Sequence, residues 1–318
     1  MPIDGSQASP RGTTTEALNL RLGSAPDSWG VWFPEDERQL PYDRFLDELA
    51  GAGYEWLELG PYGYLPTDPE VLADEVGKRG LKVSGGTVFG NLHRPEKFAE
   101  TIDIVSKVAK LTASQGAKHV VFIPPLFRDE KTDAINDVTE WDATQWKTVH
   151  ATANRIGKQM FEEYGVTIAL HPHADCQIMT QPQIETFLDG TDSDYVSLCL
   201  DTGHVAYGGG DNVDLIRRYG ERIGYVHIKQ MDPEILRQVR DEGLGFGEAV
   251  KRGVCVEPPA GVPNPADIVA ELSTLDAELF VIVEQDLYPC EPDVPFPIAV
   301  RTRKYLGGCG LGAGRQQS

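Results

Sequence analysis

The chain is 318 residues long, with 41% hydrophobic residues and a formal net charge of −20 at pH 7. This length and apolar content suit a single α/β barrel domain, and no apolar run approaches the roughly 18 residues of a membrane-spanning helix. The acidity disfavours an anionic membrane and argues against a nucleic-acid partner, because phosphate binding depends on Lys and Arg.

The two ends of the chain differ in composition from its middle. Residues 1–17 are rich in Gly, Ser, Thr and Pro, and residues 307–318 form a Gly-rich tail. We predict that the first segment is disordered and the second flexible, with the barrel over residues 18–306. The five cysteines form no CxxC pair and no secretory apolar segment opens the chain, which favours a reducing cytoplasm.

Short apolar runs alternate with amphipathic segments along the middle of the chain. The apolar runs predict strands over residues 20–26, 54–59, 81–89, 118–123, 166–171, 195–201, 223–229 and 279–283. The amphipathic segments predict helices over residues 42–52, 69–79, 95–115, 141–164, 181–188, 213–219, 265–275 and 297–306. Residues 232–259 form an insertion after the seventh strand, with a charged helix over 233–242.

Eight strand–helix repeats predict an α/β fold, a single closed (β/α)₈ TIM barrel. An open, doubly wound sheet is the alternative, but it would not bring the second and eighth strands together. In a barrel the carboxyl ends of all eight strands meet at one face, which is where active sites of this fold lie.

Four of the strands end in a residue that can bind a metal ion. Side chains alternate faces along a strand, so Val166, Ile168 and Leu170 share a bulky face while the small and polar face ends in a histidine. The ligand candidates at the four strand ends are His171, Asp201, His227 and Glu284. A mixed nitrogen and oxygen set with open positions suits Mn²⁺, Co²⁺, Fe²⁺ or Zn²⁺.

Further polar residues flank these ligands. His173 has the same parity as His171; we favour His171 as the ligand and His173 as a catalytic or substrate-contacting residue. His204 could bind a second metal, but we prefer a substrate contact. Lys229 could stabilise an oxyanion, act as a base or join an ion pair inside the barrel. Glu58 is either an acid/base group or a structural partner for a loop.

The loop over residues 27–33 contains two tryptophans and a phenylalanine, which form either a lid over the core or a substrate wall. From this loop and from strand ends we expect three substrate-binding residues. They are Trp29, Phe89 and Asp286.

Several segments resemble a known family. Residues 198–204, 225–229 and 283–286 are similar to signatures of xylose-isomerase-like TIM barrels, which include sugar phosphate isomerases, epimerases and family 2 AP endonucleases. A nearer resemblance, over roughly residues 20–306, is to the inosose dehydratase branch, through residues 22–26, 170–173 and 233–253. The last of these is the most specific, because it lies in the insertion.

The resemblance implies a metal-dependent lyase that dehydrates a keto-cyclitol or keto-sugar such as scyllo-inosose, with Mn²⁺ or Co²⁺. The reaction would proceed by abstraction of the α-proton, a metal-stabilised enolate and β-elimination of water. His173, His204, Lys229 and Glu58 are the acid and base candidates, in no assigned order. Residues 27–33 and 256–263 differ from that branch, which leaves the substrate open.

Alternatives use the same site. An isomerase or epimerase would share the enediolate chemistry, and a C-glycoside or 3-keto-glycoside lyase would expel an aryl group, for which Trp29, Trp32 and Phe33 are suited. The net charge of −20 argues against an AP endonuclease, which would need a basic DNA groove. The presence of all four ligand candidates argues against a barrel that binds sugar without catalysis. We expect a small-molecule partner and a homo-oligomer, dimer or tetramer, or a hetero-complex in the case of a C-glycoside lyase.

Overall fold

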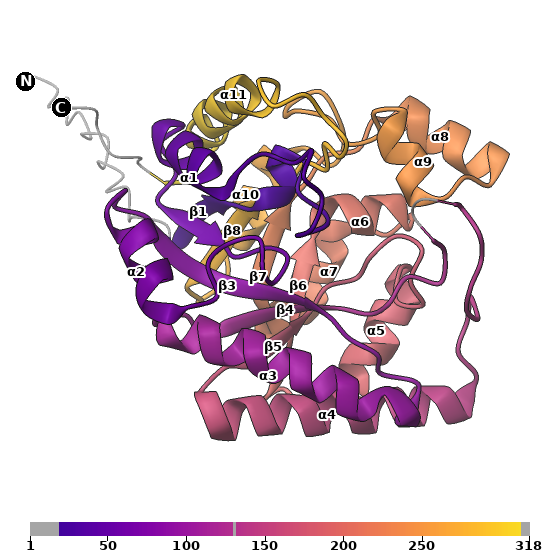
Figure 1. The fold of residues 1–318 in the computed structure, drawn as a ribbon. Coiled ribbons are helices and arrows are strands. Elements are labelled where there is room, and N and C mark those ends of the chain that lie inside the picture. Colours follow the sequence, from indigo (N-terminus) through magenta and orange to yellow (C-terminus); the bar gives the residue numbers. More distant parts are fainter. Residues whose placement is uncertain (1–18, 130–131, 313–318) are drawn as a thin grey trace, which may run out of the picture.

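The computed structural model describes residues 19–129 and 132–312, which form one closed barrel of eight parallel strands (Figure 1). The strands are β1 (Leu20–Ser24), β2 (Trp56–Glu58), β3 (Lys82–Phe89), β4 (His119–Ile123), β5 (Thr167–Leu170), β6 (Val196–Asp201), β7 (Ile223–Ile228) and β8 (Leu279–Val283). They pair in sequence order, and β1 closes the barrel against β8 in the register Leu20↔Leu279 to Ser24↔Val283. The predicted barrel is confirmed.

Helices surround the barrel (Figure 1). They are α1 (Tyr42–Gly51), α2 (Pro69–Gly77), α3 (Phe98–Ser114), α4 (Ala143–Tyr164), α5 (Gln181–Asp189), α6 (Thr202–Tyr207), α7 (Asn212–Tyr219), α8 (Pro233–Glu242), α9 (Phe246–Lys251), α10 (Pro265–Leu272) and α11 (Pro295–Gly308). Two short helices, α6 and α9, have no counterpart among the predicted elements. Both lie next to the candidate ligands, so they matter for the site.

Side-chain alternation divides the apolar residues into two cores. Val166, Ile168 and Leu170 belong to the large core between the strands and the helices. Ala169 and Cys199, of opposite parity, pack inside the barrel in a smaller cluster that also contains Tyr225. This division is the one the alternation predicts, and it directs the ligand candidates that follow these strands towards the barrel axis.

The paired glycines of β3 mark two close approaches of the backbone. A Cβ atom on Gly85 would lie 2.9 Å from the carbonyl oxygen of His119 and 3.3 Å from the hydroxyl of Tyr225 inside the barrel. A Cβ on Gly86, on the other face, would overlap the Thr112 hydroxyl of α3. A side chain at either position would therefore force β3 away from its neighbours.

The insertion forms a small unit beside the barrel, with α8 and α9 drawn in orange in Figure 1. Met231 makes isolated antiparallel bridges to Cys255 and Val262, which close the insertion at its base. Its apolar residues, including Phe246, form a separate buried cluster. The insertion is thereby held against the barrel end where the strands finish.

The predicted disordered segment 1–17 lies outside the described residues, as do residues 313–318 of the predicted tail. The described part of that tail continues α11 to Gly308, and Leu311 is buried in the large core. Among the helices of residues 19–129 and 132–312, none combines the length and the apolarity needed to cross a bilayer. The five cysteines are all free.

Candidate metal centre

The four predicted ligands lie together at the carboxyl ends of β5, β6, β7 and β8. One ligand atom from each residue lies within 4.8 Å of the other three. Nε2 of His171 is 3.3 Å from Oδ2 of Asp201 and 3.9 Å from Oε2 of Glu284. Nδ1 of His227 is 3.1 Å from the same Glu284 oxygen. Two imidazole nitrogens and two carboxylate oxygens therefore converge on one point.

Two of these buried atoms, Oδ2 of Asp201 and Nδ1 of His227, have charged neighbours but no well-aligned hydrogen bond. Buried polar atoms normally make such bonds. A divalent cation at the centre of the four residues would complete their coordination, because these donors match those of Mn²⁺, Co²⁺, Fe²⁺ and Zn²⁺ sites. The donor set fits the predicted metal.

Glu58, at the end of β2, lines the cavity and also contacts His227, one of the predicted metal ligands on β7. Nε2 of His227 donates to Oε2 of Glu58 over 2.8 Å, and the hydroxyl of Thr87 donates to Oε1. Glu58 is 1% exposed. A carboxylate that accepts from the far nitrogen of a histidine fixes the ring orientation and its tautomer, here presenting Nδ1 to the centre. Of the two predicted readings of Glu58, this contact favours the structural partner.

Lys229 lies at the centre of the acidic residues and is 2% exposed. Its Nζ is 2.9 Å from both Glu284 and Asp286 and 3.4 Å from Asp201. Burial disfavours the ammonium ion, but these three carboxylates outweigh it and raise the pKa of Lys229 well above its usual value. A Cβ on Gly203 would lie 2.6 Å from the lysine stem, so this glycine makes room for it. These contacts favour the ammonium form of Lys229.

His173 and His204 pack against each other at a tilt of 34°, with ring centroids 4.0 Å apart, but differ in their hydrogen-bond partners. Nδ1 of His204 accepts from the backbone N–H of Ala174 over 3.0 Å, which assigns the ring proton to Nε2, and this nitrogen lies 3.1 Å from Nζ of Lys229. His173 bonds through Nδ1 to the carbonyl oxygen of Ala174 at 2.7 Å. This bond assigns the proton to Nδ1 and leaves Nε2 with its lone pair. Burial, then the charge of His171, lowers the pKa of His173 to about 3, so the ring is neutral at pH 7.

Asp27 is a site residue that the sequence did not single out within its loop. It follows Pro26 in a 3₁₀ turn (Pro26–Trp29) and lines the same cavity as the ligands. Its Oδ1 is buried without a hydrogen-bond partner. Burial, followed by the charges of Glu284 and Asp286, raises the pKa of Asp27 well above its usual value. Burial and the neighbouring charges therefore favour the protonated form of the Asp27 carboxyl group.

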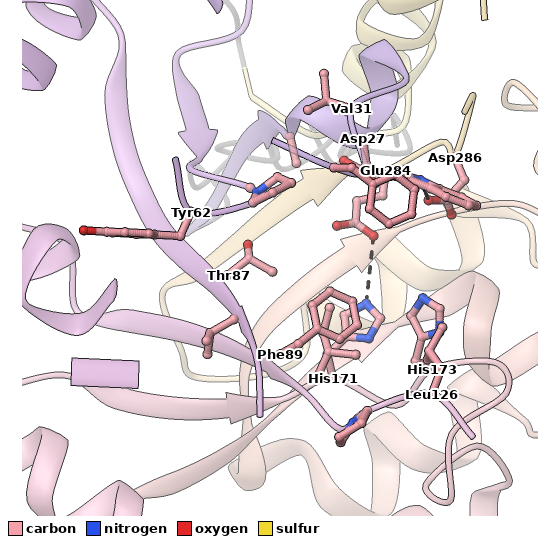
Figure 2. A pocket seen from close by; sticks show the side chains of 18 of the residues that line it. Asp27, Val31, Tyr62, Thr87, Phe89, Leu126, His171, His173, Glu284 and Asp286 are labelled. Carbon is pink, nitrogen blue, oxygen red and sulfur yellow. Dashed lines mark hydrogen bonds and ion pairs between the residues drawn. The ribbon is translucent and has the colours of Figure 1, made fainter. Parts of the chain in front are cut away.

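The ligands open into a cavity of about 600 Å³. Figure 2 shows Asp27, Glu284 and Asp286 on one side of it, His171 and His173 below them, and Phe89 and Tyr62 further out. Of the predicted substrate-binding residues, Phe89 and Asp286 line this cavity. Trp29 packs in the large core, 2% exposed, with Nε1 donating to Glu48 and its ring against Phe45.

Trp32 is the tryptophan that lines the cavity. Its Nε1 donates to Oδ1 of Asp286 over 3.0 Å, and its ring stacks on Phe246 of α9 and on Tyr288. Phe246 also meets His173 edge to face, with ring centroids 5.1 Å apart. The insertion thus contributes an aromatic wall to the site, which the sequence pattern did not reveal because α9 is only six residues long.

Comparison with proteins of known identity adds full-length relatives. The chain is 30% identical over 299 residues to inosose dehydratase of Geobacillus kaustophilus (strain HTA426), covering 90% of this chain and 94% of the relative. It is 28% identical over 297 residues to inosose dehydratase of Geobacillus thermodenitrificans (strain NG80-2), covering 92% and 98%. The similarity includes the whole barrel and not only its strand ends.

Solved structures share the fold at lower identity. The IOLI protein, solved with a bound zinc atom, superposes with a TM-score of 0.68 at 20% identity and covers 93% of this chain and 100% of its own. The probable 3-DHS dehydratase AsbF of Bacillus anthracis has a TM-score of 0.68 at 15% identity, with 90% and 98% covered. The family model described as xylose isomerase-like TIM barrel matches residues 46–291. The chain belongs to the xylose isomerase-like TIM barrel family.

Proposed function

We propose that this protein is a metal-dependent lyase that removes water from a keto-cyclitol or keto-sugar such as scyllo-inosose. The observation that carries the proposal is the convergence of His171, Asp201, His227 and Glu284 within 4.8 Å at the floor of the cavity. Full-length relatives named inosose dehydratase support the reaction and the substrate class.

The metal is Mn²⁺ or Co²⁺, with Zn²⁺ or Fe²⁺ compatible with the same donors. When bound, it supplies Lewis acidity that acidifies the carbon next to a substrate ketone. A neighbour of the same fold was solved with a bound zinc atom, which is compatible with a divalent ion in this protein.

His173 is the base in this proposal. Its Nε2 carries a free lone pair and the residue lines the cavity. Two other predicted candidates have hydrogen bonds that use their basic atoms: Glu58 accepts from His227, and Nδ1 of His204 accepts from the Ala174 N–H. His173 Nε2 therefore takes the α-proton from the substrate.

Asp27 is the acid. A carboxyl group whose pKa is raised holds the proton that the departing β-hydroxyl needs, and pairs of groups with divergent pKa values are typical of acid and base partners. Lys229, held as an ammonium among three carboxylates, provides positive charge where the ketone oxygen becomes negative. Water thus leaves as the carbon–carbon double bond forms.

The test is to incubate the Mn²⁺-loaded protein with scyllo-inosose and follow the absorbance of the hydroxy-enone, the enol form of a 1,2-diketone, that loss of one water leaves. We expect His173→Gln and Asp27→Asn each to lower kcat by about 10²–10⁴-fold, the usual contribution of a positioned acid or base. Val71→Ala, on the exposed face of α2, is the matched control. No absorbance change, with conversion of a keto-sugar to an isomer or epimer instead, would assign the site to the alternative enediolate chemistry.

A further inference from the structure

The aromatic wall that the insertion adds to the site depends on the position of Phe246, at the start of α9. Its buried ring packs edge to face on His173 and at a tilt of 49° on His204, with centroids 5.1 and 4.9 Å away. It also stacks on Trp32. A shift of α9 would therefore move a surface against which the proposed base is packed.

Helix α9 has little to hold it in place by itself. It is six residues long, and its N-cap is Gly245, which makes no side-chain hydrogen bond to the first turn. The first N–H groups of a helix have no partner within it, and so short a helix gains little from its own hydrogen bonds. The position of α9 therefore depends on contacts with other segments.

Asp175, in the segment between β5 and α5, supplies a cap from outside the insertion. Its Oδ2 accepts from the backbone N–H of Phe246 over 2.6 Å, and the residue is 8% exposed. The β4–α4 segment also approaches closely here, because a Cβ atom on Gly245 would overlap Arg128 and Asp133. The first turn of α9 is thus fixed against the barrel by a buried hydrogen bond between residues 71 positions apart.

Asp175 is also tied to the base and to the segment that follows β4. It lies two positions after His173, whose Nδ1 bonds to the carbonyl oxygen of Ala174. The carbonyl oxygen of Asp175 accepts from the Phe127 N–H over 2.7 Å, and its Oδ1 lies 3.6 Å from Nε of Arg128. Its φ of 57° is in the left-handed region, a conformation that persists only where surrounding contacts fix it.

We infer that Asp175 is a positioning residue, which holds α9 against the β5–α5 segment and thereby keeps Phe246 packed on His173. The inference rests on the proposed function for the role of His173 as the base. The anchoring of α9 by Asp175 is a separate property, and amide hydrogen exchange measures it without turnover.

The experiment compares Asp175→Gly with Asp175→Asn in the Mn²⁺-loaded full chain. Gly and Asn both tolerate a positive φ, but only Asn keeps an oxygen that can accept from the Phe246 N–H. Amides of residues 244–252 should exchange at least ~10-fold faster in Asp175→Gly, and within about threefold of wild type in Asp175→Asn. Amides of α4 should exchange at the wild-type rate in both variants.

Kinetics with scyllo-inosose then show whether the anchor matters for catalysis. We expect kcat to fall about 10- to 100-fold in Asp175→Gly, because a small displacement of the base lowers the rate of proton transfer. KM and the affinity for Mn²⁺ should stay within about threefold of wild type. Asp175→Asn should restore most of kcat, which a general loss of stability would not explain.

Asp133→Gly is the matched control. Asp133 also has a left-handed φ, of 62°, and also pairs with Arg128, at 3.1 Å, but it belongs to the β4–α4 segment and not to that of the base. Its replacement should change neither the exchange of residues 244–252 nor kcat.

Wild-type exchange in Asp175→Gly, faster exchange with wild-type kcat, or equal losses in Asp175→Gly and Asp175→Asn would each overturn the inference. Failure of the wild-type protein to dehydrate scyllo-inosose would refute the proposed function alone, because the exchange rates would still show whether Asp175 anchors α9.

Discussion

The charged side chains at the two ends of the barrel differ in their exposure to solvent. At the amino-terminal end, the Arg21 guanidinium lies over the rings of Trp56 and Phe280, at 5.3 and 5.5 Å, and pairs with Glu278 at 2.8 Å, with side chains 41% and 64% exposed. At the carboxyl-terminal end, Asp201 and Lys229 are buried among further charges. The charge of Arg21 is stabilised by water and by aromatic rings, whereas the buried Asp201 and Lys229 are stabilised mainly by each other and by the charged residues around them.

This difference separates stability from function. Exposed pairs are solvated with or without their partner, so each contributes little. Buried charges are stable only with partners, and the four ligand atoms gathered within 4.8 Å of one another suit a divalent cation. Substitutions of the charged residues at the amino-terminal end should therefore have little effect on stability. Substitutions of the buried charges at the carboxyl-terminal end should have a large effect on activity.

The largest expected effect is the removal of a ligand. Asp201→Asn should lower dehydration by at least ~10³-fold, because the metal supplies most of the stabilisation of the developing charge. Metal content after dialysis should fall with it, measured by atomic emission. Glu278→Gln, the matched change at the opposite end, should keep both. If Asp201→Asn retained both metal and activity, Asp201 would not be a metal ligand, and the two ends of the barrel would not differ in their importance for activity.

A smaller effect is expected from the residue that orients a ligand. Glu58→Gln keeps the size of the side chain but weakens its acceptance of the His227 Nε2–H bond. Loss of such a partner typically costs 10- to 100-fold in metal affinity or activity, roughly the range we expect here. Competition with a fluorescent chelator gives the metal Kd. Wild-type affinity would show that Glu58 does not position His227.

At the amino-terminal end, His119 should make stability depend on pH. Burial lowers its pKa to about 4 in the folded state, whereas the unfolded value is about 6.5. Between about pH 6.5 and 4, His119 is protonated in the unfolded chain but neutral in the folded one. The free energy of unfolding is therefore highest above about pH 6.5 and decreases as the pH falls towards 4. Urea unfolding at pH 7.5 and 5 measures the loss, on the order of 1–2 kcal/mol. His119→Leu should show a shallower pH dependence; an identical slope would contradict the assignment.

The smallest effect should come from Arg21. Arg21→Ala removes an exposed ion pair and two cation–π contacts, so we expect a loss of about 1 kcal/mol in the free energy of unfolding. Dehydration should be unchanged. A loss of several kcal/mol would mean that the amino-terminal charges act as the buried ones do.

The barrel and the convergence of the four strand-end residues were predictable because both follow from periodicity. Alternation along a strand sends Ala169 inward and Leu170 outward, and four repeats of one design place His171, Asp201, His227 and Glu284 at one end. Helix α6 was not predicted, since its signal is short: Asp201 caps it by accepting from the His204 N–H over 2.7 Å, immediately after a strand.

The aromatic wall and the acid were not predictable, because turns set them. The 3₁₀ turn Pro26–Trp29 ends at Gly30, in the left-handed region with φ 74°. Trp29 therefore packs outward against Phe45, while Trp32 lies at the cavity and Asp27 near the ligands. No periodic pattern describes such a turn. Likewise, the Glu58–His227 bond joins residues 169 positions apart across the barrel.

The central claim is that four strand-end residues hold one catalytic divalent ion. The most direct measurement strips the protein with EDTA and titrates Mn²⁺ back while both bound metal and scyllo-inosose dehydration are recorded. We predict that activity is lost on stripping and returns in proportion to one ion per chain, and that His227→Ala binds no ion and stays inactive. Full activity of the metal-free protein, or of His227→Ala, would contradict the account.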